Sequence, residues 1–404
     1  MKTYRRRKRT TLSEFPDEIL SEILSWLPAK TLLRLKSVSK QWHSLLTTQL
    51  FKNTHLNHIT KHDHQNPNKI LQLSEDGFQT IDCQSPEHGV GVTHNRPLPL
   101  TLQPTKVVIL ASCHGLVCVG VLNYGNSYYF CDLILWNPLT GEIKTLPKTN
   151  YNEECYANCR PRFGLYYSSF DNDYKLICVT ADDHNVYGYS LKNDSWRKMV
   201  DSTNCLNKIP NLKSECWRLC TWLEENLFFL KQGVKGGDDP GQWAYSIIRF
   251  DTKSEWFTEI QIPCIESESG TSYLLTVQRG KLLFYVKYCI GSIQTYIKGW
   301  SLNEDGNNWT CLETYKLKSG FISGSRPLHL MRNKDWVMMH VSLTKCRVYR
   351  VEIDEKTNRR GDGTCSYKDV ISDTGVAEEV RYIETLVSPN QYMNDQLDCS
   401  FRLE

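Results

Sequence analysis

The first part of the chain carries apolar residues at the 3.6-residue period of an amphipathic helix. Five of them share one helical stripe and are Ile19, Leu20, Ile23, Leu24 and Leu27. Pro16 and the acidic residues after it suit a first helical turn, and Pro28 ends the helix. A second helix is expected from about Thr31, and Ser39 is a suitable N-cap for a third. The pattern therefore predicts a module of three short helices over residues 12–55.

This module is too small to bury all of its apolar side chains. Three short helices enclose little apolar surface and are only marginally stable alone. The predicted helices carry more large apolar residues than they can hide among themselves, which indicates a docking surface. Packing of the same residues on the following domain is the alternative, and composition leaves it open.

Beyond residue 55 the period changes to that of β-strands. Short apolar runs alternate with Gly, Asn, Asp and Pro turns, and a repeated phrase places an aromatic residue just before such a turn. The aromatic anchors, spaced 49 to 61 residues apart, are Trp136, Tyr189, Phe250, Trp300 and Tyr349. This spacing is typical of four-stranded kelch-type blades. Residues 56–390 are expected to form a β-propeller-like domain of about six blades, and the regular repeat argues against a large β-sandwich.

One blade is expected to join the two ends of this domain. Residues 69–73 and 78–82 have strand patterns that begin it, and residues 381–387 complete it from the other end. Closure of this kind removes exposed strand edges. The fold class is therefore mainly β with a small N-terminal α module. Residues 391–404 are expected to be a C-terminal tail.

Composition indicates an ordinary globular protein. Hydrophobic residues make up 40% and charged residues 23% of the 404 residues, and the net charge of +3 is too small to make nucleic acid an expected partner. No run approaches the roughly 18 apolar residues of a membrane span, and no apolar segment follows the basic start as in a secretory signal. Cytoplasm, nucleus or both are therefore expected, without a membrane partner. The sixteen cysteines are then expected to be reduced and to pack as small apolar residues.

A basic run opens the chain. Its members are Arg5, Arg6, Arg7, Lys8 and Arg9. Such a run is typical of a nuclear import signal or of an arm that binds nucleic acid, and import is the interpretation that we favour of the two. A solvated, disordered tail over residues 1–11 is the alternative interpretation.

No motif for catalysis is present. The chain lacks a phosphate-binding loop, a dinucleotide glycine motif, a zinc-protease helix and a nucleophile elbow. His62 and His64 lie in a polar stretch without the further ligands of a zinc site. No catalytic residue, metal site or cofactor is therefore predicted. The segments 150–160, 204–214 and 233–243 are the candidate loops for binding a target protein, because loops on a stable scaffold commonly carry binding.

The order of residues in 12–46 resembles the F-box motif. The family shows a Leu-Pro opening, a Leu-Pro break and a Val-x-Lys-x-Trp segment. The matching segments here are Phe15-Pro16, Leu27-Pro28 and Val38-Ser39-Lys40-Gln41-Trp42. Phe15 replaces the usual leucine and Leu35 stands where phenylalanine or cysteine is common, and both keep an apolar side chain.

This resemblance implies docking to the Skp1-type adaptor of a cullin–RING ubiquitin ligase. The implied adaptor-binding residues are Phe15, Pro16, Ile19, Leu20, Ile23, Leu24, Leu27, Pro28, Leu32, Leu35, Val38 and Trp42. The remainder resembles the F-box-associated domain of plant F-box proteins, in segments such as His114-Gly115-Leu116-Val117 and Leu135-Trp136-Asn137-Pro138. Together they imply a non-catalytic substrate-recognition subunit of an SCF-type complex. A propeller scaffold or enzyme acting outside any ligase is the alternative.

Overall fold

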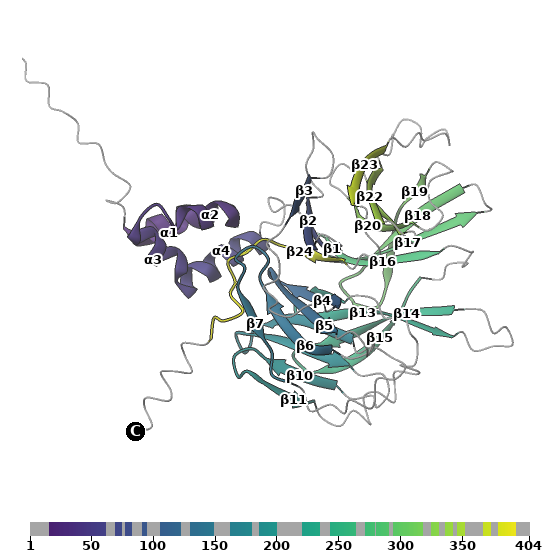
Figure 1. Ribbon diagram of the computed structural model, residues 1–404. Helices are drawn as coiled ribbons and strands as arrows, with labels where there is room; N and C mark the ends of the chain where they lie inside the picture. Colours follow the sequence, from purple (N-terminus) through teal and green to yellow (C-terminus); the bar gives the residue numbers. More distant parts are fainter. Residues whose placement is uncertain are drawn as a thin grey trace, which may run out of the picture.

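A group of four helices stands beside a set of β-sheets in the computed structural model (Figure 1). The helices are α1 (Asp17–Ser25), α2 (Ala29–Leu35), α3 (Lys40–Thr47) and α4 (Gln49–Lys61). The structure describes residues 16–61, 69–74, 77–82, 91–94, 106–122, 130–148, 162–179, 186–199, 220–234, 243–263, 271–278, 280–290, 294–317, 325–330, 336–341, 346–351, 367–372 and 379–392. Within this part of the chain, no helix is long and apolar enough to cross a membrane.

Proline and hydroxyl residues set the starts of the helices. Pro16 and Pro28 precede α1 and α2 with ψ angles of 146° and 140°, outside the helical range. Ser39 Oγ accepts a hydrogen bond of 3.1 Å from the backbone nitrogen of Trp42 and so caps α3. The expectation of three helices needs a correction at Thr48, whose ψ of 144° interrupts the third. Thr48 Oγ1 accepts from the backbone nitrogen of Phe51 at 3.2 Å, so a fourth helix follows.

The helices enclose a small apolar core. Its buried residues from the helices are Leu24, Ala29, Leu32, Leu46 and Phe51. Leu386, from the opposite end of the described chain, belongs to the same cluster. The helical module therefore shares its core with the β domain and does not stand apart from it.

The β domain contains six four-stranded antiparallel sheets in the described residues, which we number as blades. Blade 1 contains β24 (Glu379–Tyr382), β1 (Lys69–Ser74), β2 (Gly77–Asp82) and β3 (Gly91–His94). Blade 2 contains β4 (Lys106–Cys113), β5 (Leu116–Leu122), β6 (Phe130–Trp136) and β7 (Ile143–Thr145). Blade 3 contains β8 (Arg162–Ser168), β9 (Asp173–Val179), β10 (Val186–Ser190) and β11 (Ser195–Lys198).

The other three blades repeat this order. Blade 4 contains β12 (Thr221–Leu223), β13 (Asn226–Val234), β14 (Trp243–Asp251) and β15 (Trp256–Gln261). Blade 5 contains β16 (Ser272–Gln278), β17 (Lys281–Ile290), β18 (Gln294–Leu302) and β19 (Trp309–Leu317). Blade 6 contains β20 (Ser325–Leu330), β21 (Trp336–Val341), β22 (Cys346–Val351) and β23 (Tyr367–Ser372).

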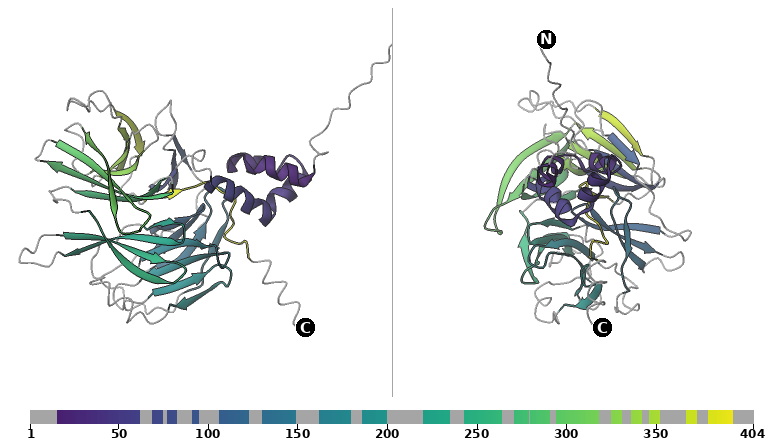
Figure 2. Two further views of the ribbon diagram at one scale, coloured as in Figure 1. Left: turned by 180° about the vertical axis from the view of Figure 1, so that it is seen from behind. Right: turned by 90° about the vertical axis from the view of Figure 1, so that its left-hand side faces the viewer.

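The blades are arranged around a common centre, with the helices in front of them in the right-hand view of Figure 2. From blade 1 to blade 6, the strand named first in each blade contacts the strand named first in the following blade, in the order β24, β4, β8, β12, β16 and β20. The predicted fold class, mainly β with a small helical module before a propeller-like domain, is confirmed.

The aromatic anchors occupy equivalent places in five blades. Each lies in the third strand of its sheet, and these strands are β6, β10, β14, β18 and β22. Trp136 packs with Leu71 of blade 1, and Phe250 packs with Tyr166 of blade 3. The repeat in the sequence therefore reflects the packing of one blade against its neighbour.

Blade 1 joins the two ends of the β domain. Strand β24 pairs antiparallel with β1, and Val380 lies opposite Leu71. The expected closing strand at 381–387 needs a correction, because the paired strand ends at Tyr382. The residues after Tyr382 leave the sheet, since they are bound by the helices on one side and by blades 2 and 3 on the other.

Candidate docking surfaces

Three apolar side chains of α1 and the turn after it face outward. Ile19, Ile23 and Trp26 have exposed fractions of 48%, 55% and 46%. Spacings of four and three residues place them on one side of the helix. The Trp26 ring centre lies 4.4 Å from that of His58, and Trp26 Nε1 donates to Glu22 Oε1 at 3.3 Å. These contacts hold the indole in place while almost half of it stays open to a partner.

The twelve residues predicted to bind an adaptor differ in their exposure to solvent. The exposed members are Pro16, Ile19, Ile23, Pro28 and Val38, and the half-buried members are Leu27, Leu35 and Trp42. Leu20, Leu24 and Leu32 are only 1%, 4% and 0% exposed. These three side chains are buried inside the module, so they support the helices from within, and the docking face stays a prediction that the exposed members carry. Phe15 and the basic run at 5–9 lie outside the described residues.

Two exposed apolar residues of the helical module are missing from the predicted face. Trp26 follows Ile19 by seven residues, so the helical period could have identified it. Leu50 is 78% exposed, because the break at Thr48 redirects the chain just before it. No sequence pattern predicts the direction of the helix after that break.

A buried histidine ties α4 to the end of α1. His55 is 0% exposed, and its Nε2 lies 3.0 Å from the carbonyl oxygen of Leu27, so Nε2 carries the proton and donates it. His55 Nδ1 has no hydrogen-bond partner among the described residues. Burial lowers the pKa of His55 to about 4. The helical module is therefore assembled around a neutral imidazole.

Residues 383–392, which we name the C-terminal segment, run between the helices and the propeller (Figure 1). Glu384 forms an ion pair of 3.4 Å with Lys30 of α2 and another of 2.8 Å with Lys69 of β1. Leu386 enters the apolar core of the helical module. These two side chains connect the segment to the helices and to blade 1.

The intervening side chains of the C-terminal segment face the propeller. Thr385 Oγ1 donates to the carbonyl oxygen of His114 at 2.7 Å, and Val387 packs in the core of blades 2 and 3. Asn137 Nδ2 donates to the carbonyl oxygens of Thr385 and Val387 at 3.0 and 2.7 Å. The segment is thus bound on both sides, because alternate side chains of an extended chain point in opposite directions.

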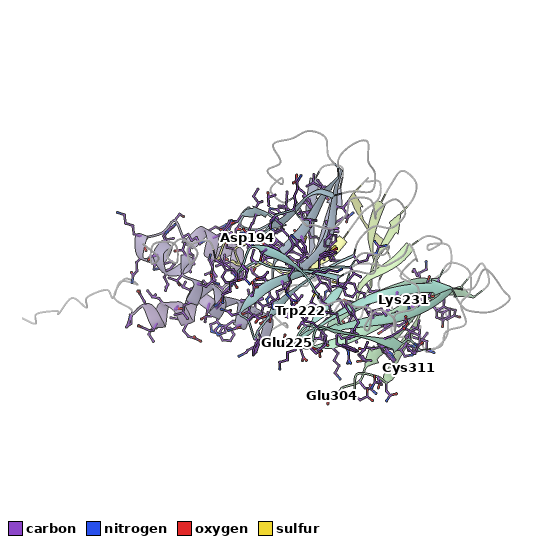
Figure 3. All side chains as sticks on the ribbon, turned by 90° about the horizontal axis from the view of Figure 1, so that it is seen from below. Asp194, Trp222, Glu225, Lys231, Glu304 and Cys311 are labelled. Carbon is purple, nitrogen blue, oxygen red and sulfur yellow. The ribbon has the colours of Figure 1, made fainter. Side chains whose placement is uncertain are left out.

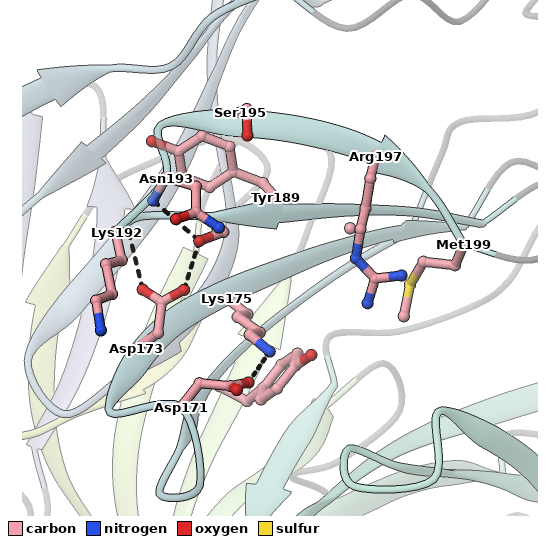
Figure 4. Close-up of a pocket in the computed structure, with 12 residues that line it drawn as sticks. Asp171, Asp173, Lys175, Tyr189, Lys192, Asn193, Ser195, Arg197 and Met199 are labelled. Carbon is pink, nitrogen blue, oxygen red and sulfur yellow. Dashed lines mark hydrogen bonds and ion pairs between the residues drawn. The ribbon is translucent and has the colours of Figure 1, made fainter.

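A pocket of about 270 Å³ lies on blade 3 (Figure 4). Its charged lining residues are Asp171, Asp173, Lys175, Lys192 and Arg197. Asp173 accepts hydrogen bonds from Ser190 Oγ at 2.6 Å and from the backbone nitrogen of Lys192 at 2.9 Å. Burial raises the pKa of Asp173, and these bonds act against that rise. Asp173 therefore joins the start of β9 to the turn between β10 and β11.

The other charges of this pocket also have partners. Lys175 pairs with Asp171 and holds the pKa of that carboxyl below its usual range. Arg197 forms an ion pair with Glu255, which lies in the turn between β14 and β15 and so connects blade 3 with blade 4. The polar groups of the pocket are thus explained by contacts within and between blades.

The two sides of the propeller differ in their connections. The turns at His114 and Asn172 contact the C-terminal segment, so these short turns lie on the side of the helices. Strand β13 leads away from that side, from the turn at Glu225 past Lys231 (Figure 3). The candidate loops 150–160, 204–214 and 233–243 join strand ends on the side away from the helices. Most residues of these loops lie outside the described residues.

Two known families match this chain, one after the other, from residue 12 to residue 360. Residues 12–54 match the F-box domain, and residues 55–360 match the F-box associated beta propeller domain. F-box protein CPR1 of Arabidopsis thaliana is 25% identical over 378 residues, which cover 86% of this chain and 85% of that protein.

Other relatives from the same plant align over shorter stretches. The protein named "Putative F-box only protein 15" is 29% identical over 192 residues, or 46% of each chain. An F-box/kelch-repeat protein is 24% identical over 270 residues, or 63% of this chain and 61% of its own. The chain therefore spans about half and about three fifths of these two relatives.

Solved structures resemble the protein only distantly. The lectin of Aleuria aurantia aligns over 77% of this chain and 97% of its own, at 11% identity and a TM-score of 0.37. A similarity this low carries no argument about function. The family matches, by contrast, cover the helical module and most of the β domain, in the order in which the structure places them. The chain therefore belongs to the F-box proteins that carry an F-box-associated β-propeller domain.

Proposed function

We propose that the protein is the substrate-recognition subunit of an SCF-type ubiquitin ligase. In this proposal the helical module binds a Skp1-type adaptor, and through it a cullin–RING ligase, while the propeller binds the target protein. The subunit is non-catalytic, and other subunits transfer ubiquitin. The exposed row of Ile19, Ile23 and Trp26 is the observation that carries the proposal.

This row has the features of a protein-binding surface. Burying an entire Ile side chain contributes about 1.5–3 kcal/mol. Covering the exposed half of Ile19 and of Ile23 would therefore contribute roughly 1 kcal/mol of binding free energy for each residue. Trp26 adds a large aromatic surface of the kind that often dominates binding energy. Asp17 and Glu18, in the first turn of α1, supply polar residues at one end of the row.

The test uses residues that the core does not need. Replacing Ile19 and Ile23 together by Asp places two charges in the row while Leu20 and Leu24 stay buried. Binding of a purified Skp1-type adaptor, measured by calorimetry, should weaken at least about 100-fold, which corresponds to about 2.8 kcal/mol. Phe170→Asp is the control, because Phe170 is 83% exposed but lies in blade 3, and this variant should bind normally.

Two results would contradict the proposal. One is normal adaptor binding by the Ile19→Asp, Ile23→Asp variant. The other is a wild-type protein that binds no adaptor. In either case a propeller scaffold or enzyme acting outside any ligase becomes the better interpretation.

The target is proposed to bind on the side of the propeller away from the helices. The helical side carries short turns and is partly covered by the C-terminal segment, whereas the long candidate loops join strand ends on the other side. Val234 pairs with Trp243 at the end of blade 4, so an Asn-Gly turn could replace residues 235–242 and keep the hairpin. This variant should bind adaptor normally and lose targets that wild-type protein captures when the proteasome is blocked. Capture of the same targets by both proteins would contradict a role for this loop.

We propose location in the cytoplasm and the nucleus. The basic residues at positions 5–9 support nuclear import, since clusters of Lys and Arg are typical of import signals. Neither a membrane nor nucleic acid is part of the proposal.

A further inference from the structure

One residue near the C-terminus completes the core of the N-terminal module. Leu386 is 2% exposed and clusters with Leu24, Leu32, Leu46 and Phe51. Those four residues belong to α1, α2, α3 and α4 respectively. Leu386 is therefore the only buried member of this described cluster that does not come from the helices or the turns between them.

The neighbours of Leu386 are held by the propeller. Thr385 and Val387 are 0% and 3% exposed, and both have their carbonyl oxygens bound by Asn137. Tyr382, three residues before Thr385, still belongs to β24 and pairs with Lys69 of β1. The residue that fills the helical core is thus separated by only three positions from the strand that closes blade 1.

We propose that the C-terminal segment couples closure of the propeller to adaptor docking. The helical module presents a stable docking face only when Leu386 is inserted, and Leu386 is inserted only when β24 and Asn137 hold the segment in place. This inference rests on the proposed function, since it names the regulation of the same docking face.

The path from Leu386 to the docking face is short. Leu24 packs in the cluster with Leu386, and its neighbour Ile23 faces outward from α1. Removing Leu386 would leave a cavity against Leu24 and loosen α1, because packed cores tolerate lost volume poorly. Glu384 adds a second link, since it pairs with Lys30 of α2 and with Lys69 of β1.

Coupling of this kind acts in both directions. If the seated segment favours adaptor binding, the bound adaptor must favour the seated segment by the same factor. Adding adaptor to the wild-type protein should therefore slow hydrogen exchange in residues 383–392, far along the chain from the docking helices. This measurement needs no substitution and so does not depend on a variant that folds.

The test compares Leu386→Ala with a matched change elsewhere. Leu282→Ala also truncates a buried leucine, 1% exposed, but in the core between blades 4 and 5. Hydrogen exchange of residues 16–61 should accelerate at least about tenfold in Leu386→Ala, equivalent to about 1.4 kcal/mol, and should not change in Leu282→Ala. Leu386→Met conserves volume and should restore slow exchange. Glu384→Gln removes the charge without removing core volume and should give a smaller acceleration.

Two readouts separate this inference from the proposed function. Exchange in residues 16–61 is measured on the protein alone, and adaptor affinity is measured separately. Faster exchange together with at least about tenfold weaker adaptor binding supports the coupling. Faster exchange in a protein whose wild type binds no adaptor supports the structural link and removes the ligase role. Unchanged exchange in Leu386→Ala, or equal acceleration in Leu282→Ala, overturns the coupling whatever the adaptor does.

Discussion

Asn137 donates a hydrogen bond of 2.7 Å from its side-chain nitrogen to the carbonyl oxygen of Val387. The same nitrogen donates to the carbonyl oxygen of Thr385 at 3.0 Å, and Asn137 Oδ1 accepts from the backbone nitrogens of Leu139 and Thr140 at 2.9 and 3.2 Å. The residue is 0% exposed, so all of its polar groups are satisfied inside the protein. A single amide therefore holds the turn after β6 and the C-terminal segment together.

Replacing Asn137 by Asp should destabilise the protein strongly. A carboxylate at this place would face two carbonyl oxygens without a proton to donate. Each buried polar group left without a partner costs about 1–3 kcal/mol, so we expect a loss of about 3 kcal/mol or more in the free energy of unfolding. Urea denaturation followed by circular dichroism measures it. Asn193→Asp makes the same change at an exposed turn position and should alter stability by about 0.5 kcal/mol at most. Equal losses in both variants would contradict this role of Asn137.

Gly115 is expected to tolerate no side chain. Its φ is +84°, and a Cβ there would lie 2.7 Å from the carbonyl oxygen of Ile383 and still closer to Thr385 Oγ1. Gly280 has a φ of +68° with nothing within 4 Å, so it isolates the backbone effect alone. Gly280→Ala should destabilise by about 1 kcal/mol, and Gly115→Ala by about 2 kcal/mol more because of the clash. Melting curves of the two variants give the comparison. Similar losses would show that the C-terminal segment can move aside easily.

The buried His55 predicts a loss of stability in mild acid. Its pKa of about 4 in the folded protein lies below the ordinary value of 6.5, so the unfolded chain takes up a proton first as the pH falls. This contribution to stability is complete above about pH 6.5 and declines toward pH 4, by up to about 3 kcal/mol. Burial also lowers the pKa of His114 to about 4, so this propeller residue makes a second contribution to stability that is lost in acid.

His55→Gln separates the two histidines. A Gln amide can still donate to the carbonyl oxygen of Leu27 but does not titrate. Denaturation at several pH values between 7.5 and 4.5 should show a shallower pH dependence for this variant than for the wild type. Parallel curves would mean that His55 is not the titrating group.

Nuclear import through the basic run predicts a change in location. Replacing Arg5, Arg6, Arg7, Lys8 and Arg9 by Ala should shift a fluorescent fusion toward the cytoplasm. Replacing the four arginines by lysine keeps the charge and should preserve nuclear signal. If the alanine variant is distributed like the wild type, the run is an ordinary charged tail.

The blades could be predicted from the sequence because their packing repeats locally. Trp136, Tyr189 and Phe250 each lie in a third strand and pack against the preceding blade. Each blade therefore needs a large aromatic residue at the same position, and these residues recur at a regular spacing. Closure by the two ends was predictable from the strand patterns near residues 69 and 381. The end of this strand at Tyr382 was not predictable. Residues 383–388 have the same strand-like pattern, and only their contacts in the folded protein place them outside the sheet.

The docking face was only partly predictable for a related reason. Leu24 and Ile23 are adjacent and similarly apolar, and the helical period alone does not show which of them faces the core of the helical module. The core that decides it includes Leu386, which no local pattern connects to the helices. The candidate loops could be located between strands, but their side of the propeller follows only from the strand directions.

The place of Leu386 also affects how the protein is made. During synthesis the helices are made before Leu386, so α1 to α4 lack this core residue while the propeller strands between them are being made. A nascent or prematurely ended chain has all of the residues of the docking face but lacks the packing that supports it. Chains that end before Leu386 should therefore compete poorly with finished chains for the proposed adaptor. The position of Leu386 in the sequence thus favours binding by chains whose propeller has already been made.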